Sequence, residues 1–102
     1  MKLEGKKVLV VGAGKSGIAA SELLLDKKIE TVLYDGNKDL DVEKLYEKAP
    51  KLKGMPVLLG ELTDEQLRAF DVAVLSPGVP TDLPVVERMR AQNVCIWGEI
   101  EL

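Results

Sequence analysis

Residues 6–17 read Lys6-Lys7-Val8-Leu9-Val10-Val11-Gly12-Ala13-Gly14-Lys15-Ser16-Gly17, and the architecture expected for the 102-residue chain follows from them. A short apolar run is followed at once by three glycines spaced G-x-G-x-x-G, and residues 18–25 then read as a helix. Strand, glycine turn and helix in this order give the motif its structural meaning. Gly12 allows a sharp turn, Gly14 lets a phosphate approach the backbone, and Gly17 lets the helix pack closely on the strand.

A helix that starts in such a turn presents unpaired N–H groups and a partial positive charge to any anion above it. We therefore predict a phosphate or diphosphate site at residues 12–17. Lys15 could add a charge-assisted bond or simply point into water, and Ser16 could donate to a phosphate or merely cap the helix. The alternative is a glycine-rich turn that only connects strand to helix.

The remaining chain alternates between strand and helix patterns. Strands are expected at 6–11, 31–34 with Asp35 at the end, 55–59, 71–75 and 94–97, and helices at 16 or 17 to 25, 41–48, 64–70 and 83–91. A loop is expected at 50–54. Core positions are expected at Ile18, Leu23, Leu24 and Leu25 of the first helix and at Cys95.

Such alternation predicts an α/β fold: a three-layer, Rossmann-like domain with a five-stranded parallel sheet in the order 3-2-1-4-5 and helices on both faces. Ligands of these sheets bind beyond the carboxyl ends of the strands, where the strand order reverses. The glycine turn, Asp35 and the Ser76-Pro77-Gly78 loop all follow strands, so we expect them to share one rim. Asp35 could accept hydrogen bonds from a ribose or another donor-rich group, or be a solvated loop carboxylate.

Composition excludes several function classes. The net charge of -3 implies no basic face for nucleic acid, and the apolar runs are too short for a membrane span. The first five residues lack the apolar segment of a signal peptide, and a single cysteine excludes an internal disulfide, so the cytoplasm is the expected compartment. With no histidine, a metal site is not expected, and no catalytic group stands out.

Four features together resemble the Mur ligases of bacterial cell-wall synthesis. They are the glycine stretch at 5–17, Asp35 after the second strand, Ser76-Pro77-Gly78 after the fourth, and Gly98-Glu99-Ile100-Glu101-Leu102 at the end. The last two discriminate, because the glycine motif alone would equally suggest a dinucleotide. The final residues also look like the start of an element without its end, so we expect one domain of a longer protein.

The resemblance implies an N-terminal domain over residues 1–102 that holds the UDP part of UDP-N-acetylmuramoyl-L-alanine. It implies that the parent uses ATP and magnesium to form an acyl phosphate, which the amine of D-glutamate attacks. The ATP-binding central domain and the C-terminal domain would lie beyond residue 102, so this domain is expected to bind without catalysing and to need no cofactor. The substrate-binding positions implied are Gly14, Lys15 and Ser16 for the diphosphate, Asp35, Gly36 and Asn37 for uracil, and Ser76 and Gly78 for the loop beside the nucleotide-sugar.

Two other functions remain open at this point. An NAD-binding domain of an oxidoreductase would have the same glycine motif and the same acidic residue at the end of the second strand. A regulatory domain that senses nucleotides without catalysis is the third. No interface is evident in the polar stretch 38–53, so a monomer is expected.

Overall fold

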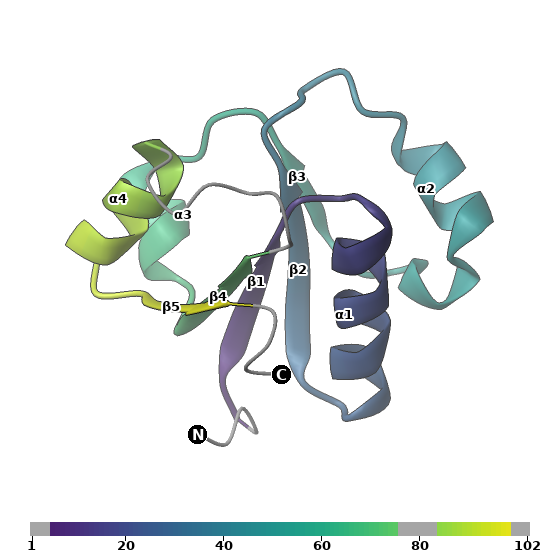
Figure 1. Ribbon diagram of the computed structural model, residues 1–102, viewed down its shortest axis with the longest axis horizontal. Helices are drawn as coiled ribbons and strands as arrows, with labels where there is room; N and C mark the ends of the chain where they lie inside the picture. Colours follow the sequence, from purple (N-terminus) through teal and green to yellow (C-terminus); the bar gives the residue numbers. More distant parts are fainter. Residues whose placement is uncertain (1–4, 76–83, 99–102) are drawn as a thin grey trace.

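The computed structural model describes residues 5–75 and 84–98, in which strands and helices alternate (Figure 1). The elements are β1 (Lys7–Val11), α1 (Lys15–Asp26), β2 (Glu30–Asp35), α2 (Val42–Lys48), a 3₁₀ helix η1 (Pro50–Leu52), β3 (Val57–Leu59), α3 (Asp64–Arg68), β4 (Val72–Leu75), α4 (Pro84–Ala91) and β5 (Cys95–Gly98). The predicted alternation is confirmed, with boundaries shifted by one or two residues. The expected loop at 50–54 contains η1, and Leu52 of η1 is fully buried.

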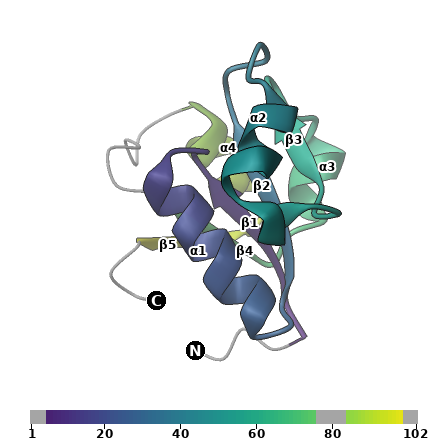
Figure 2. The same ribbon diagram turned by 90° about the vertical axis from the view of Figure 1, so that its right-hand side faces the viewer.

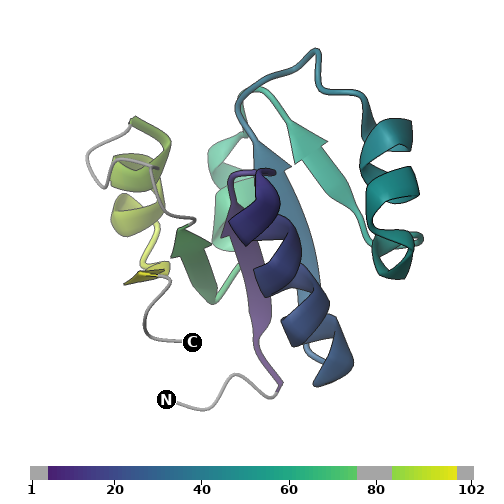
Figure 3. The same cartoon turned by 45° about the vertical axis from the view of Figure 1, so that its right-hand side comes forward.

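All five strands are parallel and lie in the order β3-β2-β1-β4-β5, which confirms the predicted topology. In this register Val11 of β1 lies beside Tyr34 of β2 and Leu75 of β4. The three central strands therefore end at one edge of the sheet. The segments that follow β1 and β2 emerge side by side there (Figure 3).

Helices cover both faces of the sheet, so the molecule has three layers. Helices α1 and α2 lie on one side and α3 and α4 on the other (Figure 1), and Figure 2 looks onto the α1 and α2 side. A hydrophobic cluster lies on each face of the sheet, and β1 contributes side chains to both. Val8 and Val10 belong to the cluster on the α1 side, and Leu9 and Val11 belong to the cluster on the α4 side. The continuous apolar run at 8–11 is explained by this two-sided burial.

The caps at two helix starts follow from local sequence. Thr63 and Gln66 form a capping box: the Thr63 hydroxyl accepts from the Gln66 amide at 3.1 Å, and the Gln66 side-chain oxygen accepts from the Thr63 amide at 2.8 Å. Asp41 caps α2 by accepting from the Lys44 amide at 3.2 Å. Both helices therefore start with their leading amides partly satisfied, unlike α1.

Two expected core positions are wrong. Leu23 is 41% exposed, because the buried stripe of α1 runs through Gly17, Ala20, Ser21 and Leu24 and a helical period places Leu23 off that stripe. Cys95 is exposed on the edge strand β5. Helix α4 packs on the face of β5 that carries Ile96, and Cys95 points to the opposite face.

Candidate functional site at the carboxyl edge of the sheet

The glycine turn leaves β1 at Gly12, whose φ of +102° lies in a region that residues with a Cβ rarely adopt. The Gly12 amide donates to the carbonyl of Tyr34 on β2 at 2.7 Å. The chain therefore stays attached to the sheet for one residue beyond β1 before it turns toward α1. Backbone geometry alone requires glycine at this position.

Gly14 has no such requirement. It is the N-cap residue of α1, with an ordinary extended backbone (φ −75°, ψ −175°). Among the described residues, a Cβ built on it would meet nothing within 4 Å, and both Gly14 and Lys15 are exposed. Neither strain nor packing within the described residues calls for glycine here. The open space beside Gly14 lets a bulky group come close to the main chain.

The N-terminus of α1 has neither a side-chain cap nor an acidic residue in its first turn. The amide of Ile18 closes the first helical hydrogen bond, to the carbonyl of Gly14 at 2.9 Å. The N–H groups ahead of Ile18 have no acceptor inside the helix, and the aligned peptide dipoles make this end positive. Exposed Lys15 adds a charge, and Ser16 lies half-buried on the same turn. This arrangement suits an anion with several oxygens.

Small side chains bring α1 close to the sheet behind this turn. Gly17 is buried, and Ser21 is fully buried with its hydroxyl donating to the Gly17 carbonyl at 2.8 Å. Ala20 and Leu24 complete the stripe that faces the sheet. The close approach fixes where the free amides of α1 lie relative to β1 and β2.

Asp35 ends β2 and lies at the same edge. One carboxylate oxygen accepts from the amide of Ala13 in the glycine turn at 3.0 Å, and the other accepts from the amide of Asn37 at 2.8 Å. Sequence reasoning placed Asp35 at this rim as an acceptor for a ligand. Its acceptors in the structure are turned to the protein's own backbone.

Asn37 accepts the hydrogen bonds that form the turn after Asp35. Its side-chain oxygen accepts from the Asp39 amide at 3.0 Å, and its carbonyl accepts from the Leu40 amide at 3.1 Å. Gly36 and Asn37 are exposed. The Asn37 side chain thus maintains a turn.

Tyr34 and Gly60 also belong to this rim, and sequence reasoning missed both. The Gly60 amide donates to the Asp35 carbonyl at 3.0 Å, and the Tyr34 hydroxyl donates to the Gly60 carbonyl. Burial raises the pKa of Tyr34 above 10.0, the carboxylates of Asp35 and Glu61 raise it further, and Arg88 opposes them. A polar aromatic directly before the predicted acidic residue was the available signal.

The carboxyl edge therefore brings together six of the eight predicted binding positions: Gly14, Lys15, Ser16, Asp35, Gly36 and Asn37. The other two, Ser76 and Gly78, lie outside the described residues. Strand β4, which precedes them, ends at Leu75 in register with Val11.

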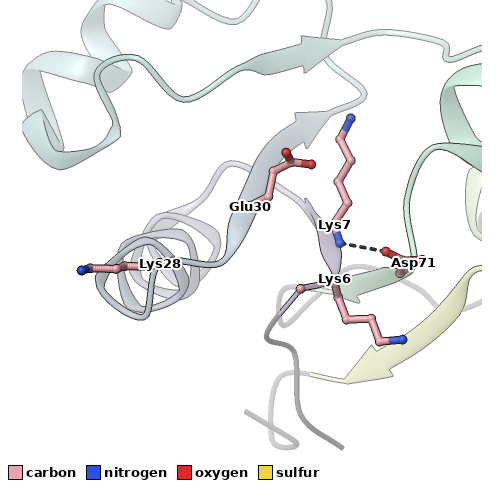
Figure 4. A pocket seen from close by; sticks show the side chains of 6 residues that line it. Lys6, Lys7, Lys28, Glu30 and Asp71 are labelled. Carbon is pink, nitrogen blue, oxygen red and sulfur yellow. Dashed lines mark hydrogen bonds between the residues drawn. The ribbon is translucent and has the colours of Figure 1, made fainter.

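A hollow of about 280 Å³ lies at the opposite, amino edge of the sheet. Its charged lining is Lys6, Lys7, Lys28, Glu30 and Asp71. Figure 4 shows the Lys28 side chain directed away from the others and the ammonium groups of Lys6 and Lys7 diverging. The Lys7 amide is bonded to Asp71 at 2.9 Å. These groups do not converge on a common point, and they lie at the end of the strands where doubly wound sheets do not bind ligands.

Within residues 5–75 and 84–98 no group of three or more His, Cys, Asp or Glu side chains is arranged to hold a metal ion. In that same part of the chain, every helix is too short or too polar to cross a bilayer.

A sequence model described as "Mur ligase MurD-like, N-terminal domain" matches residues 6–98. The curated UDP-N-acetylmuramoylalanine–D-glutamate ligases of Lachnoclostridium phytofermentans and Lachnospira eligens are 48% and 42% identical to the chain over 102 residues. Each alignment covers all of this chain but 22% of the relative, so the chain spans about a fifth of the length of these relatives.

Among solved structures, a pseudomurein peptide ligase type C from Methanothermus fervidus matches with a TM-score of 0.72 at 19% identity, over 94% of this chain and 19% of that chain. The (S)-3-hydroxybutyryl-CoA dehydrogenase of Ralstonia eutropha matches with a TM-score of 0.59 at 16% identity, over 91% and 40%. At these identities the likeness shows the fold alone, which ligases and dehydrogenases share.

Proposed function

The chain belongs to the MurD-like Mur ligase family, as its N-terminal domain, and on that premise we propose that it holds the UDP part of UDP-N-acetylmuramoyl-L-alanine. The names of the relatives at 48% and 42% identity supply this substrate class. The oxidoreductase alternative has support only from the shared fold, the glycine motif and the acidic residue Asp35 at the end of β2.

One observation carries the proposal: the uncapped N-terminus of α1 beside the open approach at Gly14. A diphosphate presents several anionic oxygens, which match a row of backbone amides better than a single charge would. Lys15 and Ser16 stand on this first turn and are proposed as its side-chain donors. Gly14 is proposed to allow the close approach itself.

The uracil end is proposed to lie over the segment that follows β2. Asp35 ends β2 beside the glycine turn, and Gly36 and Asn37, which follow it, are exposed. Ser76 and Gly78 stay proposed contacts to the nucleotide-sugar. The proposal needs no cofactor in this domain.

For the whole protein we propose an ATP-dependent, ADP-forming ligase of the cytoplasm that joins D-glutamate to the L-alanine carboxylate. Magnesium would help ATP supply the activating phosphoryl group. For this domain we propose substrate binding without a catalytic step, and we expect it to be a monomer by light scattering.

The deciding experiment titrates the ¹⁵N-labelled 102-residue chain with UDP-N-acetylmuramoyl-L-alanine, UDP and NADH in separate series. The proposal expects both uridine ligands to shift the amides of residues 14–17 and 35–37, with NADH weaker. Lys15→Ala should weaken UDP binding, whereas Lys27→Ala, at the other end of α1, should not. Binding of NADH alone would reverse the assignment. ATP hydrolysis by this chain would contradict a purely binding role.

A further inference from the structure

The last two residues of β2 hold three separate loops of the rim. Backbone carbonyls of Tyr34 and Asp35 accept from the amides of Gly12 and Gly60, and the Tyr34 hydroxyl reaches back to the Gly60 carbonyl. The Asp35 carboxylate also accepts hydrogen bonds from the amides of Ala13 and Asn37. The glycine turn is thus bonded to β2 at two successive residues, once by backbone and once by a side chain.

The bond from Ala13 to Asp35 crosses 22 positions of sequence and is the only one of these bonds that ties the turn to β2 through a side chain. Ala13 lies between Gly12, which has an unusual φ, and Gly14, which carries no Cβ to restrain it. Glycines leave a backbone free to adopt many conformations. A charge-assisted acceptor on the intervening amide is therefore well placed to select one of them.

Asp35 uses one oxygen for this turn and the other for the segment that begins at Asn37, at 3.0 and 2.8 Å. The two loops are the proposed diphosphate site and the proposed base site. One rigid carboxylate plane between them fixes the distance from one to the other.

We propose that Asp35 is a positioning residue: it sets the conformation of the glycine turn and its spacing from the 36–40 segment, and it affects nucleotide affinity through the turn amides. This inference rests on the proposed function for the ligand. A direct contact between Asp35 and the base or ribose is the competing explanation, and the two differ in what they predict for a ligand that has neither.

The first test needs no ligand. Amide hydrogen exchange and ¹H chemical shifts are measured by NMR for the chain and for Asp35→Ala, Asp35→Asn and Asp39→Ala. Asp39 is a matched control, since its carboxylate makes no hydrogen bond with the described residues. Asp35→Ala should speed exchange at Ala13 by about tenfold or more and move its proton signal upfield, because a bond to a charged group is lost. Asp35→Asn retains one side-chain oxygen, so it should keep a hydrogen bond from one of the two amides and protect that amide from exchange. An unchanged Ala13 amide would overturn the proposal.

The second test compares inorganic pyrophosphate with UDP. If Asp35 acts through the turn, Asp35→Ala weakens pyrophosphate binding by about tenfold and UDP binding by at least as much, because UDP also depends on the spacing to the 36–40 segment, and Asp35→Asn falls between. Electrostatics alone predicts the opposite sign, since removing a carboxylate should favour anions, as Asp39→Ala is expected to do slightly. Weaker UDP with unchanged pyrophosphate would establish direct contact instead and overturn the proposal.

The two hypotheses fail in different ways. If no uridine ligand binds but the Ala13 amide still responds to Asp35, the proposed function is wrong and the structural part of the inference stands. If UDP binds and loses affinity in Asp35→Ala while the Ala13 amide is unchanged, the function stands and the positioning role is wrong.

Discussion

Replacing Gly14 by serine should make the protein more stable and less able to bind its ligand. Position 14 is an N-cap with φ −75° and ψ −175°, and an added Cβ has no neighbour within 4 Å in the part of the chain that the structure describes. Serine there can accept from a leading amide of α1, which improves on glycine by a few tenths of a kcal/mol. Loss of glycine's freedom in the unfolded chain adds about 0.4–1 kcal/mol. The sum, about 1 kcal/mol, corresponds to a rise of about 4–8 °C in Tm for a domain of this size.

The same hydroxyl takes an amide that a diphosphate would use, and the new Cβ stands where it would approach. Loss of one bond to a charged oxygen is worth about 1.5–3 kcal/mol, or a fall in UDP affinity of about 10- to 100-fold. Calorimetric titration and thermal unfolding of the same samples give both numbers. Ala19→Ser is the control, because it adds a hydroxyl at an exposed site further along α1. Unchanged UDP affinity in Gly14→Ser, or a clear loss of stability, would refute the reasoning.

Three further predictions concern stability. Gly12→Ala should destabilise by about 1–3 kcal/mol in urea unfolding, because φ is +102° there; a neutral result would show that the turn can relax. Leu24→Ala should cost about 2–5 kcal/mol and its neighbour Leu23→Ala under about 1 kcal/mol, since Leu24 is 1% and Leu23 41% exposed; equal losses would contradict the assigned face of α1. Tyr34→Phe should cost about 1 kcal/mol near neutral pH through the bond to Gly60. Because the pKa of Tyr34 is raised above 10.0, the folded protein holds this proton more tightly than the unfolded chain, so wild-type stability falls as pH rises through that raised pKa. Urea unfolding at about pH 8 and about pH 11 should therefore show the gap between wild type and Tyr34→Phe narrowing.

Local patterns were sufficient for the topology. The strand, glycine turn and helix at 6–25, followed by further alternation, allow few arrangements, and β3-β2-β1-β4-β5 is the one found. The same patterns did not predict correctly which side chains of a given helix or strand are buried. Leu23 sits in an apolar run of three leucines, and only the position of the buried stripe on α1 distinguishes it from Leu24. Cys95 has a small apolar side chain, but it lies on the edge strand β5 and is exposed there.

For the candidate site, too, the position could be predicted from the sequence but the individual contacts could not. The edge that carries Gly14 and Asp35 could be predicted, because parallel strands place their carboxyl ends together. The long-range hydrogen bonds of this edge could not be predicted, since the bond from Ala13 to Asp35 joins residues 22 apart and the bond from Tyr34 to Gly60 joins residues 26 apart. Sequence spacing predicts which residues lie at the carboxyl edge of the sheet. It does not show which of them already form hydrogen bonds within the protein.

Because the amides of Gly12 and Ala13 are bonded to β2, a ligand bound at the glycine turn should stabilise the whole folded domain and not the turn alone. Without β2 in place these two amides lose their acceptors, so the unfolded chain offers no equivalent anion cradle. A ligand that binds only the native form stabilises it by RT ln(1 + [L]/Kd), about 2.7 kcal/mol at a hundredfold excess over Kd. An anion resting on a few amides would thereby delay melting of all five strands, and a thermal-shift screen could rank candidate ligands before any contact is mapped.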